Sequence, residues 1–248
     1  MKRNISLLCA ACALLILPSC KFIRVSDELL SQMQGNPQGI SIDIDTHGES
    51  INPSDNVITQ DEVTGEFHNL QVNIPGDVIY TPGDCFFNIT GPDNVLEHTT
   101  VRNENGTLVV KSDGTRFRNL KNLKITVSSP VLEEVVFNGA VDFDAPQGIT
   151  ALDFNATVNG AGDISINGLK AGKVNVTVNG AGDATIYRIE CDDLKLSING
   201  AGDATVSGTA GTADLSISGA GDIDALDLKA ENITSKVRGI GKIKKAKI

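Results

Sequence analysis

A five-residue turn recurs through the second half of the chain and constrains the fold more than any other feature. It reads Asn-Gly-Ala-Gly-Asp in three copies and Ser-Gly-Ala-Gly-Asp in a fourth, at residues 159–163, 179–183, 199–203 and 218–222. The first glycines of successive copies are 20, 20 and 19 residues apart. A period near twenty residues is typical of a solenoid, in which each repeat forms one coil stacked on the previous one.

Short alternating segments flank each turn. Val174, Val176 and Val178 precede the second copy with polar residues between them, and Ala184 and Ile186 follow it. Alternation with a period of two predicts strands that are buried on one face. A helix is excluded because β-branched residues and paired glycines recur at short intervals.

Stacked coils of this kind predict an all-β fold, a right-handed parallel β-helix-like solenoid with coils of about 20 residues. Small and medium aliphatic side chains would fill its core, in keeping with an aromatic content of 4% and no Trp. The glycines permit a positive φ at the corners, and equivalent corner residues stack into columns. The predicted column residues are Gly160, Asp163, Gly180, Asp183, Gly200, Asp203, Gly219 and Asp222, beside a column of Asn159, Asn179, Asn199 and Ser218.

The first twenty residues have the pattern of a bacterial secretory signal. Lys2 and Arg3 precede an apolar stretch, residues 7–17, that is too short to span a bilayer. The stretch ends in Leu-Pro-Ser-Cys, which resembles a lipobox with cleavage before Cys20 and lipid on its thiol. An ordinary secretory signal with an incidental Cys20 is the alternative. The lipid reading predicts a membrane anchor at Cys20 and an outer-membrane lipoprotein of the cell envelope.

Two cysteines remain once the signal and Cys20 are set aside. Cys85 and Cys191 could form a disulfide in an oxidising compartment, but two separate free thiols are favoured because Cys191 lies in a coil linker before two acidic residues. No metal-type cysteine spacing is present, and the three histidines, His47, His68 and His98, are isolated. We therefore expect no metal and no cofactor.

The pattern divides the chain into a signal at 1–19, a lipidated Cys20 with a flexible tether through residue 45, and one solenoid domain at 46–248. Within that domain, 57–137 form irregular strands that cap the solenoid and 138–248 form the regular repeats. Strands are expected at 67–74, 78–80, 85–89, 95–101, 108–111 and 123–127, with a hairpin turn at Asn105-Gly106. The acidic run 26–28 faintly resembles a surface-export signal of Bacteroides-group lipoproteins, and a charged tether is the alternative.

The chain ends in a lysine-rich strand. Lys242, Lys244, Lys245 and Lys247 crowd the last coil, where the sheet would otherwise present an open edge. Lysines on such an edge prevent another strand from pairing with it. A basic patch for anionic partners is the alternative.

The order of these motifs resembles the bacterial head GIN domain family, whose members carry the description of auto-transporter adhesins. The resemblance runs from about Val63 to Lys244 and includes Gly-Glu-Phe at 65–67, Gly-Thr-Leu at 106–108, the passage 125–132 and the run of Gly-Ala-Gly-Asp turns. It implies a secreted or surface-anchored β-solenoid, here a lipoprotein of Bacteroides-group type. It implies no catalytic residues.

The aspartate column is the sharpest candidate site. Carboxylates on adjacent coils could bind Ca²⁺, or an adjacent pair could serve a retaining glycosidase. A catalytic pair would be a single unusual site, however, and this one is repeated. We favour a structural role in which each Asp accepts a backbone N–H bond within its own turn.

The remaining patterns favour a non-enzyme. No nucleophile, phosphate-loop or dinucleotide motif is present, and a net charge of −10 disfavours nucleic acid as a partner. Two functions stay open: a non-catalytic surface protein that binds a glycan or a protein, and an envelope enzyme on a β-helix, such as a polysaccharide lyase or hydrolase. The repeats show no cluster of basic, acidic and histidine residues on one face, so the non-catalytic adhesin is favoured.

Overall fold

The computed structural model describes residues 50–62 and 64–246 of the chain. The predicted signal, the predicted lipidation site Cys20 and the predicted tether lie outside the described residues. The described residues all belong to one compact unit. Among the described residues, no helix is long and apolar enough to cross a membrane.

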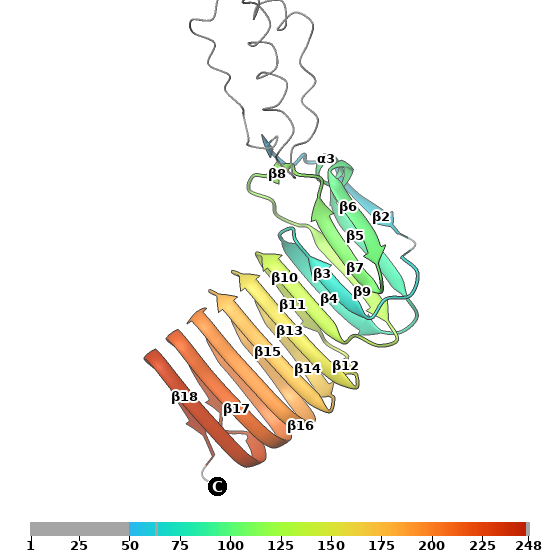
Figure 1. Cartoon of the computed structure of the whole chain (residues 1–248). Coiled ribbons are helices and arrows are strands. Elements are labelled where there is room, and N and C mark those ends of the chain that lie inside the picture. The colour runs from blue at the N-terminus through green and yellow to red at the C-terminus, as the bar shows by residue number, and fades with distance from the viewer. Residues whose placement is uncertain (1–49, 63, 247–248) are drawn as a thin grey trace, which may run out of the picture. The chain divides into compact units, whose positions relative to one another are not determined.

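The second half of the chain is a β-solenoid, and the structure has about six turns with coils of roughly 20 residues (Figure 1). Its strands are β10 (Glu134–Gly139), β11 (Val141–Ala145), β12 (Ile149–Thr150), β13 (Asp153–Gly160), β14 (Ile164–Lys170), β15 (Lys173–Gly180), β16 (Ala184–Ala201), β17 (Ala204–Ala225) and β18 (Leu228–Lys245). Every neighbouring pair among them is parallel. Gly160 pairs with Gly180, Gly180 with Gly200, and Gly200 with Gly219, so the register follows the sequence repeat and confirms the predicted fold class.

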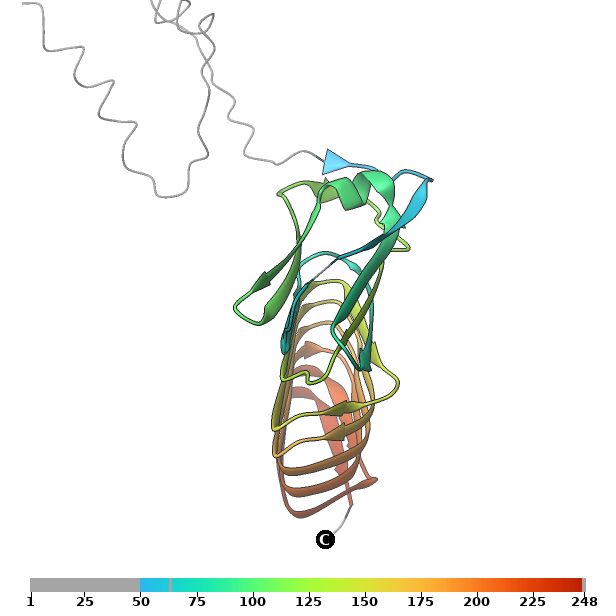
Figure 2. The same ribbon diagram turned by 90° about the vertical axis from the view of Figure 1, so that its right-hand side faces the viewer.

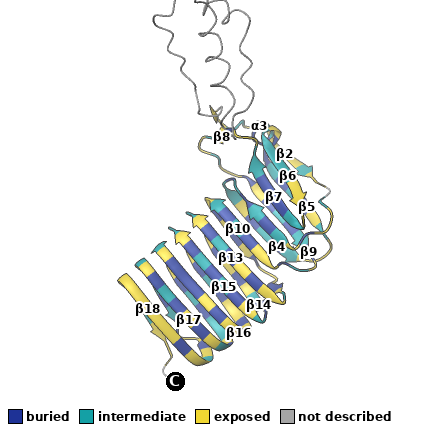
Figure 3. Ribbon diagram, viewed as in Figure 1, coloured by how far each residue is buried: buried dark blue, intermediate teal, exposed yellow. Residues whose placement is uncertain are grey.

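Alternating aliphatic residues fill the interior of the coils. Val176 and Val178 of β15 stack on Leu196 and Ile198 of β16, and all four are buried. Each inward position thus repeats from coil to coil, and Figure 3 shows the buried positions as bands that alternate with exposed ones along the strands. In the first regular coil, larger side chains take over, and the rings of Phe137 and Phe143 pack 5.2 Å apart. This alternation is the packing that the period of two predicts.

The later strands run through their linkers without a break. β16 passes through Glu190, Cys191 and Asp193, which keep parallel partners in the next coil. The ladder skips between Ile186 and Ile189, where the register shifts by one residue, and Arg188 has a φ of 51°. β16 therefore has two residues opposite a single residue of β17, and the coil that begins at β17 is one residue shorter than its neighbours, which accounts for the 19-residue step in the sequence repeat.

The first two coils are stacked out of sequence order. They consist of β3 (Asn69–Val72), β4 (Gly76–Pro82), β7 (Thr107–Ser112) and β9 (Lys124–Ser129). β3 lies between β7 and β10, and β4 lies between β9 and β11. The first coil, β3 and β4, therefore lies between the second, β7 and β9, and the third, β10 and β11. After β9 the chain crosses back through residues 130–133 to the other side of the first coil. The expectation of an irregular start is met, but the strict coil-by-coil order does not extend to it.

Antiparallel strands and one short helix cover the outer end of this cap (Figures 1 and 2). They are β2 (Val57–Asp61), β5 (Phe86–Pro92), α3 (Asp93–Glu97) and β6 (Thr99–Glu104), with the two-residue strands β1 (Ser50–Ile51) and β8 (Arg116–Phe117) paired beside them. β5 pairs with β9, β2 with β5, and β6 with β7, in each case antiparallel. Such an end layer closes a solenoid whose interior would otherwise open to water.

Two local expectations in the cap have different outcomes. The hairpin at Asn105-Gly106 is confirmed, because both residues have a positive φ and the turn joins β6 to β7. The strand expected at 95–101 is wrong at its start, because Val95 and Leu96 lie in α3. Pro92 is the residue before that helix and Asp93 opens it, accepting hydrogen bonds from the backbone N–H of Asn94 and the hydroxyl of Ser54. A carboxylate in the first turn interacts favourably with the unpaired N–H groups of a helix start, which here outweighs the strand propensity of Val95.

Candidate functional site

The predicted aspartate column is assembled by the corner turns of successive coils. In each case the backbone N–H of one Asp donates to Oδ1 of the Asp in the preceding coil. The donors and acceptors are Asp163 to Asp142 (3.1 Å), Asp183 to Asp163 (2.8 Å), Asp203 to Asp183 (2.8 Å) and Asp222 to Asp203 (2.7 Å). The column thus starts at Asp142, in the degenerate turn that precedes the four copies.

These bonds correct the expectation that each Asp binds within its own turn. At the corner, the carbonyl of Asp183 accepts the N–H of Ile164, whereas the N–H of Asp183 donates to a side chain of the coil below. Parallel coils lie about 4.8 Å apart, which places the carboxylate of one coil under the amide of the next. At this position the carboxylate oxygen therefore takes the place of a backbone carbonyl as the hydrogen-bond acceptor between adjacent coils.

A second column runs parallel to the first and consists of side-chain amides. Each Asn donates from Nδ2 to Oδ1 of the Asn below it, with distances of 2.6, 2.9, 2.9 and 3.0 Å, along Asn73, Asn138, Asn159, Asn179 and Asn199. The sequence repeat identified the later members but missed Asn73 and Asn138. Asn138 could have been found, because it precedes Gly139 as Asn159 precedes Gly160, whereas Asn73 has no glycine after it.

The glycines between the two columns are required by crowding as well as by conformation. Gly180 has a φ of 147°, and a Cβ on it would lie 1.9 Å from the carbonyl oxygen of Gly160. Gly182 has no such positive φ, yet a Cβ there would lie 2.1 Å from the carbonyl oxygen of Gly162. Both glycine columns thus allow the backbones of adjacent corners to approach more closely than a side chain permits.

The aspartate column leaves few groups that could bind a ligand or take part in a reaction. One oxygen of each carboxylate is already an acceptor for the next coil, and the residues around it are glycines and an alanine. Among residues 50–62 and 64–246, no group of three or more His, Cys, Asp or Glu side chains is placed to hold a metal ion. The proposed calcium role of Asp163, Asp183, Asp203 and Asp222 stays untested.

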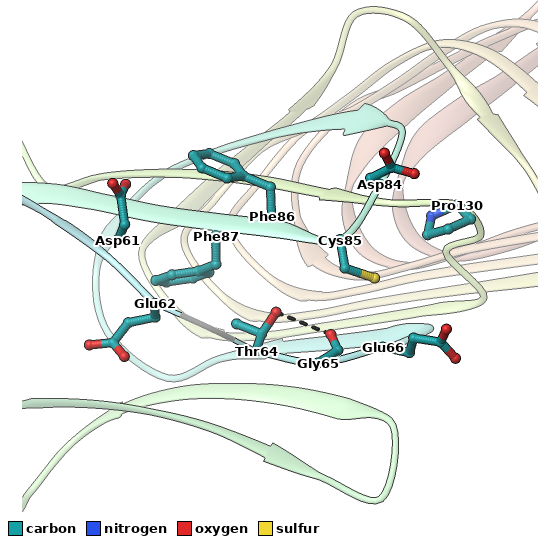
Figure 4. A pocket seen from close by; sticks show the side chains of 10 residues that line it. All are labelled: Asp61, Glu62, Thr64, Gly65, Glu66, Asp84, Cys85, Phe86, Phe87 and Pro130. Atoms are coloured by element: carbon teal, nitrogen blue, oxygen red, sulfur yellow. Dashed lines mark hydrogen bonds between the residues drawn. The ribbon is translucent and has the colours of Figure 1, made fainter.

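A cavity of about 570 Å³ lies at the capped end, in a region that the sequence patterns did not single out (Figure 4). Three segments meet there: the approach to β3, the turn from β4 into β5, and the crossover after β9. Four acidic side chains line it, Asp61, Glu62, Glu66 and Asp84, together with Thr64, Gly65, Cys85, Phe86, Phe87 and Pro130. Phe86 is 46% exposed, whereas Phe87 belongs to the core. The hydroxyl of Thr64 donates to the carbonyl oxygen of Gly65, 3.2 Å away.

Both described cysteines are free thiols, which confirms the favoured expectation. Cys85 lines the cavity, whereas Cys191 lies in β16. Burial first, and then the carboxylates of Asp192 and Asp193, raise the pKa of the Cys191 thiol to about 11. A thiol with so high a pKa is a weak nucleophile at neutral pH.

One histidine takes part in a polar cluster that the sequence did not indicate. In the cap, Nδ1 of His98 lies 3.1 Å from Oδ2 of Asp113 and 3.2 Å from the hydroxyl of Thr115. The bond from His98 is the main cause that lowers the pKa of Asp113 to about 2, and the hydroxyl and backbone N–H of Thr115 contribute. Asp113 also accepts the backbone N–H of Thr115 at 3.0 Å, so the cluster fixes the turn after β7.

Known structures share this architecture. The crystal structure of a "putative adhesin" from Bacteroides fragilis is 25% identical, covers 79% of this chain and 99% of its own, and has a TM-score of 0.65. A "putative lipid binding protein" from Parabacteroides distasonis, 18% identical, covers 80% and 100% with a TM-score of 0.69. A "putative adhesin" from Parabacteroides merdae, 17% identical, covers 81% and 100% with a TM-score of 0.53. No curated protein matches the chain.

The family comparison agrees with the motifs and the fold. The model of the "putative auto-transporter adhesin, head GIN domain" family matches residues 66–187 and, in a second overlapping match, residues 157–246. The overlap falls within the coils whose repeat is most regular, as expected when one repeat can be aligned on another. Because the two matches together span more than half of the sequence, the chain belongs to the head GIN domain family.

Proposed function

We propose that this protein is a cell-envelope lipoprotein, anchored in the outer membrane through lipid on Cys20, whose solenoid is a non-catalytic adhesin that binds a surface glycan or a protein. The family and the similar B. fragilis structure carry the description of adhesins, which supports a surface role. The short apolar stretch and the Leu-Pro-Ser-Cys sequence that ends it support the anchor.

The main support for a non-catalytic role is the way in which the corner carboxylates are hydrogen-bonded. Each is repeated on the next coil and accepts a backbone hydrogen bond there, so none of them is singled out for acid or base work. A catalytic carboxylate pair has two members in different environments, which give them different pKa values. Here the members of the column share one environment.

The outward faces of the strands provide the surface that an adhesin needs. On the face formed by β13, β15, β16 and β17, one outward column consists of short hydroxylated residues, Thr157, Thr177, Ser197 and Ser216. Ser197 is buried and the other three are half-buried, so the longer polar side chains on either side of them provide most of the exposed surface. The hydroxyl of Ser216 donates to that of Ser197, 3.0 Å away, so these two members of the column hold each other in place. A rigid polar face of repeated side chains suits recognition of an extended polar ligand, because little conformational entropy is lost on binding.

A binding screen tests the adhesin role directly. The mature chain, residues 20–248 with Cys20→Ser so that it stays soluble, would be applied to arrays of glycans and matrix proteins. Saturable binding to a defined ligand without its turnover is the expected result. Cleavage of a polysaccharide on the array would instead identify an enzyme, and the absence of any saturable ligand would contradict the adhesin role.

Membrane fractionation tests the anchor separately. Cys20→Ser in the full-length chain should move the protein from the membrane fraction to the soluble fraction. Cys85→Ser serves as the matched control and should leave the protein with the membranes. Retention of the Cys20→Ser protein after a carbonate wash would show that the anchor is not lipid on that residue.

A further inference from the structure

The charges of the described residues are segregated along the solenoid. The last coil, residues 232–246, contains five basic residues and no acidic one: Lys236, Arg238, Lys242, Lys244 and Lys245. In residues 50–231, acidic residues outnumber basic ones by more than two to one. The end of the solenoid remote from the cap is therefore a positive pole on an otherwise acidic molecule.

Four of the five cations occupy outward positions of the last coil, each in register with an outward residue of the coil before it. Lys236 pairs in register with Ser216 and Arg238 with Ser218 on one face, whereas Lys242 pairs with Asp222 and Lys244 with Asp224 on the next. All four side chains are exposed. They follow one another along a single strand that bends at the corner between Gly239 and Gly241, so the cations line a rim that crosses two faces of the coil.

Interactions with the coil below hold this rim in place. The backbone N–H of Lys242 donates to Oδ1 of Asp222 at 2.8 Å, and Nζ of Lys244 lies 3.8 Å from Oδ2 of Asp224. Lys245 occupies the inward position that Ala225 has in the coil below, and its Nζ donates to the carbonyl oxygen of Ile233 at 3.0 Å. Lys245 thus lies over the end of the core. The side chain of Lys244 stays 50% exposed beside Asp224, and those of Lys236, Arg238 and Lys242 are also exposed to solvent or a ligand.

Protection of the sheet edge explains part of this pattern. Among the described strands, β18 pairs only with β17, and lysines on its free edge deter pairing with a further chain. Lys242 also replaces the carboxylate that would accept the N–H of a further coil. Edge protection does not require that all charges have one sign, and it does not explain Ile240, which is 83% exposed where the preceding coils have alanine.

We propose that the rim formed by Lys236, Arg238, Lys242 and Lys244 binds a linear anionic polysaccharide, sulfated or carboxylated. The four cations point outward around a bend, so a small anion reaches one or two of them, whereas a flexible polymer that follows the rim meets them in turn. Repeated ionic contacts of this kind add up through effective concentration. The exposed Ile240 at the corner offers an apolar contact for the sugar rings.

Nucleic acid fits the rim less well. Residues 232–246 contain no aromatic side chain on which unpaired bases could stack. A duplex is stiff over about 50 nm, so it cannot follow the bend and reaches only part of the rim. This inference rests on the proposed surface role, because a protein on the cell surface is exposed to polysaccharides.

Heparin, as a sulfated probe, tests the rim. The mature chain with Cys20→Ser should bind immobilised heparin, with an affinity that falls steeply with salt, and should not bind uncharged dextran. A variant with Lys236, Arg238, Lys242 and Lys244 changed to Gln should bind heparin at least ten-fold more weakly and with a shallower salt dependence, because fewer cations are neutralised. The matched control changes the exposed Lys121, Lys124, Lys173 and Lys195 to Gln, which removes the same charge, and should bind as the unmodified chain does.

Additional measurements keep the inference open to refutation. Replacing Lys236, Lys242 and Lys244 by Arg should preserve binding, which separates charge from folding of the last coil. Equal weakening by the rim variant and the control variant would overturn the proposal, as would tighter binding of single-stranded DNA than of heparin, or self-association of the chain through the rim in light scattering. If the rim fails and another ligand binds on the arrays, the adhesin role stands without this site.

Discussion

The backbone N–H of Asp203 donates to Oδ1 of Asp183 across 2.8 Å, so a side chain of one coil completes the backbone ladder of the next. The same contact recurs from Asp142 up to Lys242, the last residue of the column, which donates to Asp222 but offers no carboxylate in return. The column is therefore directional, and it ends where the chain replaces Asp by Lys.

Replacement of Asp183 tests the role of this contact. Asp183→Asn keeps an acceptor oxygen toward Asp203. We therefore expect a loss of stability below about 1 kcal/mol, less than the loss for Asp183→Ala, which removes the acceptor and should cost about 1 kcal/mol. Thermal unfolding followed by circular dichroism would rank the two variants. Asp144→Ala, an exposed carboxylate outside the column, is the control and should leave the midpoint nearly unchanged.

The glycine corners allow a sharper test, because one of them is free of crowding. Gly139 and Gly180 both have a positive φ, 124° and 147°, but a Cβ on Gly139 would meet nothing within 4 Å. Gly139→Ala should lower the stability only through backbone strain at its positive φ, by about 1–3 kcal/mol. Gly180→Ala adds a clash with the carbonyl of Gly160 and should lose more than about 3 kcal/mol, because overpacking adds to strain.

Unfolding midpoints separate these two glycine variants. For a domain of this size, each kcal/mol shifts the midpoint by about 2–4 °C. Gly180→Ala should therefore lie well below Gly139→Ala, or accumulate as insoluble protein. Equal midpoints would show that φ alone requires glycine at these corners and that adjacent coils can move apart.

The regular coils were predictable from sequence because every local signal in them agrees. Strand alternation, corner glycines and a constant period all indicate the same register, so the repeat alone aligns Gly160, Gly180 and Gly200 correctly. Even there, the partner of each Asp was missed. A sequence repeat shows which residues are equivalent but not whether a side chain bonds within its coil or to the next one.

The cap could not be read in the same way. Its strands have no period, and the order β7, β3, β10 depends on a crossover at residues 130–133 that carries no local signal. The cavity there collects Glu62 from before β3, Asp84 from before β5 and Pro130 from the crossover. Residues so far apart in sequence come together only through that non-sequential stacking.

Acid titration should reveal the pair of His98 and Asp113. The pKa of Asp113 is lowered to about 2 in the folded protein, mainly by the bond from His98, from an ordinary value of 3.8. A lowered pKa means that the carboxylate stabilises the fold above about pH 4 and that this contribution is lost as the pH falls toward 2. Asp113→Asn should therefore be less stable than the unmodified chain at pH 5, and the difference should shrink by pH 2.

Denaturant melts at pH 5, 4, 3 and 2 would measure that difference. His98→Gln with and without Asp113→Asn provides the control, because Asp113→Asn should have a smaller effect once the histidine is absent. A stability difference that does not change between pH 5 and pH 2 would contradict the assignment of the low pKa to this pair.

The thiol of Cys191 should be unreactive at neutral pH. Its pKa of about 11 results first from burial and then from the carboxylates of Asp192 and Asp193. In the mature chain with Cys20→Ser and Cys85→Ser, alkylation by iodoacetamide at pH 8 should be slow compared with a free cysteine peptide, because the thiolate is the nucleophile. Adding Asp192→Asn and Asp193→Asn should increase the rate modestly, since burial remains. A rate equal to that of the peptide would rule out the raised pKa.

Calcium offers the decisive test of the aspartate column, because its two interpretations predict opposite responses. If the carboxylates serve only the ladder between coils, thermal unfolding with calcium and with chelator should coincide within about a degree or two, the shift of a few tenths of a kcal/mol at this size. If the second oxygens of neighbouring carboxylates hold calcium, the ion stabilises the folded state by mass action and chelator lowers the midpoint. Asp183→Asn would then remove most of that response, whereas Asp144→Asn would not. We expect coincident curves, since one oxygen of each carboxylate is already bonded to the next coil. A calcium-dependent rise that Asp183→Asn abolishes would make the column a metal site.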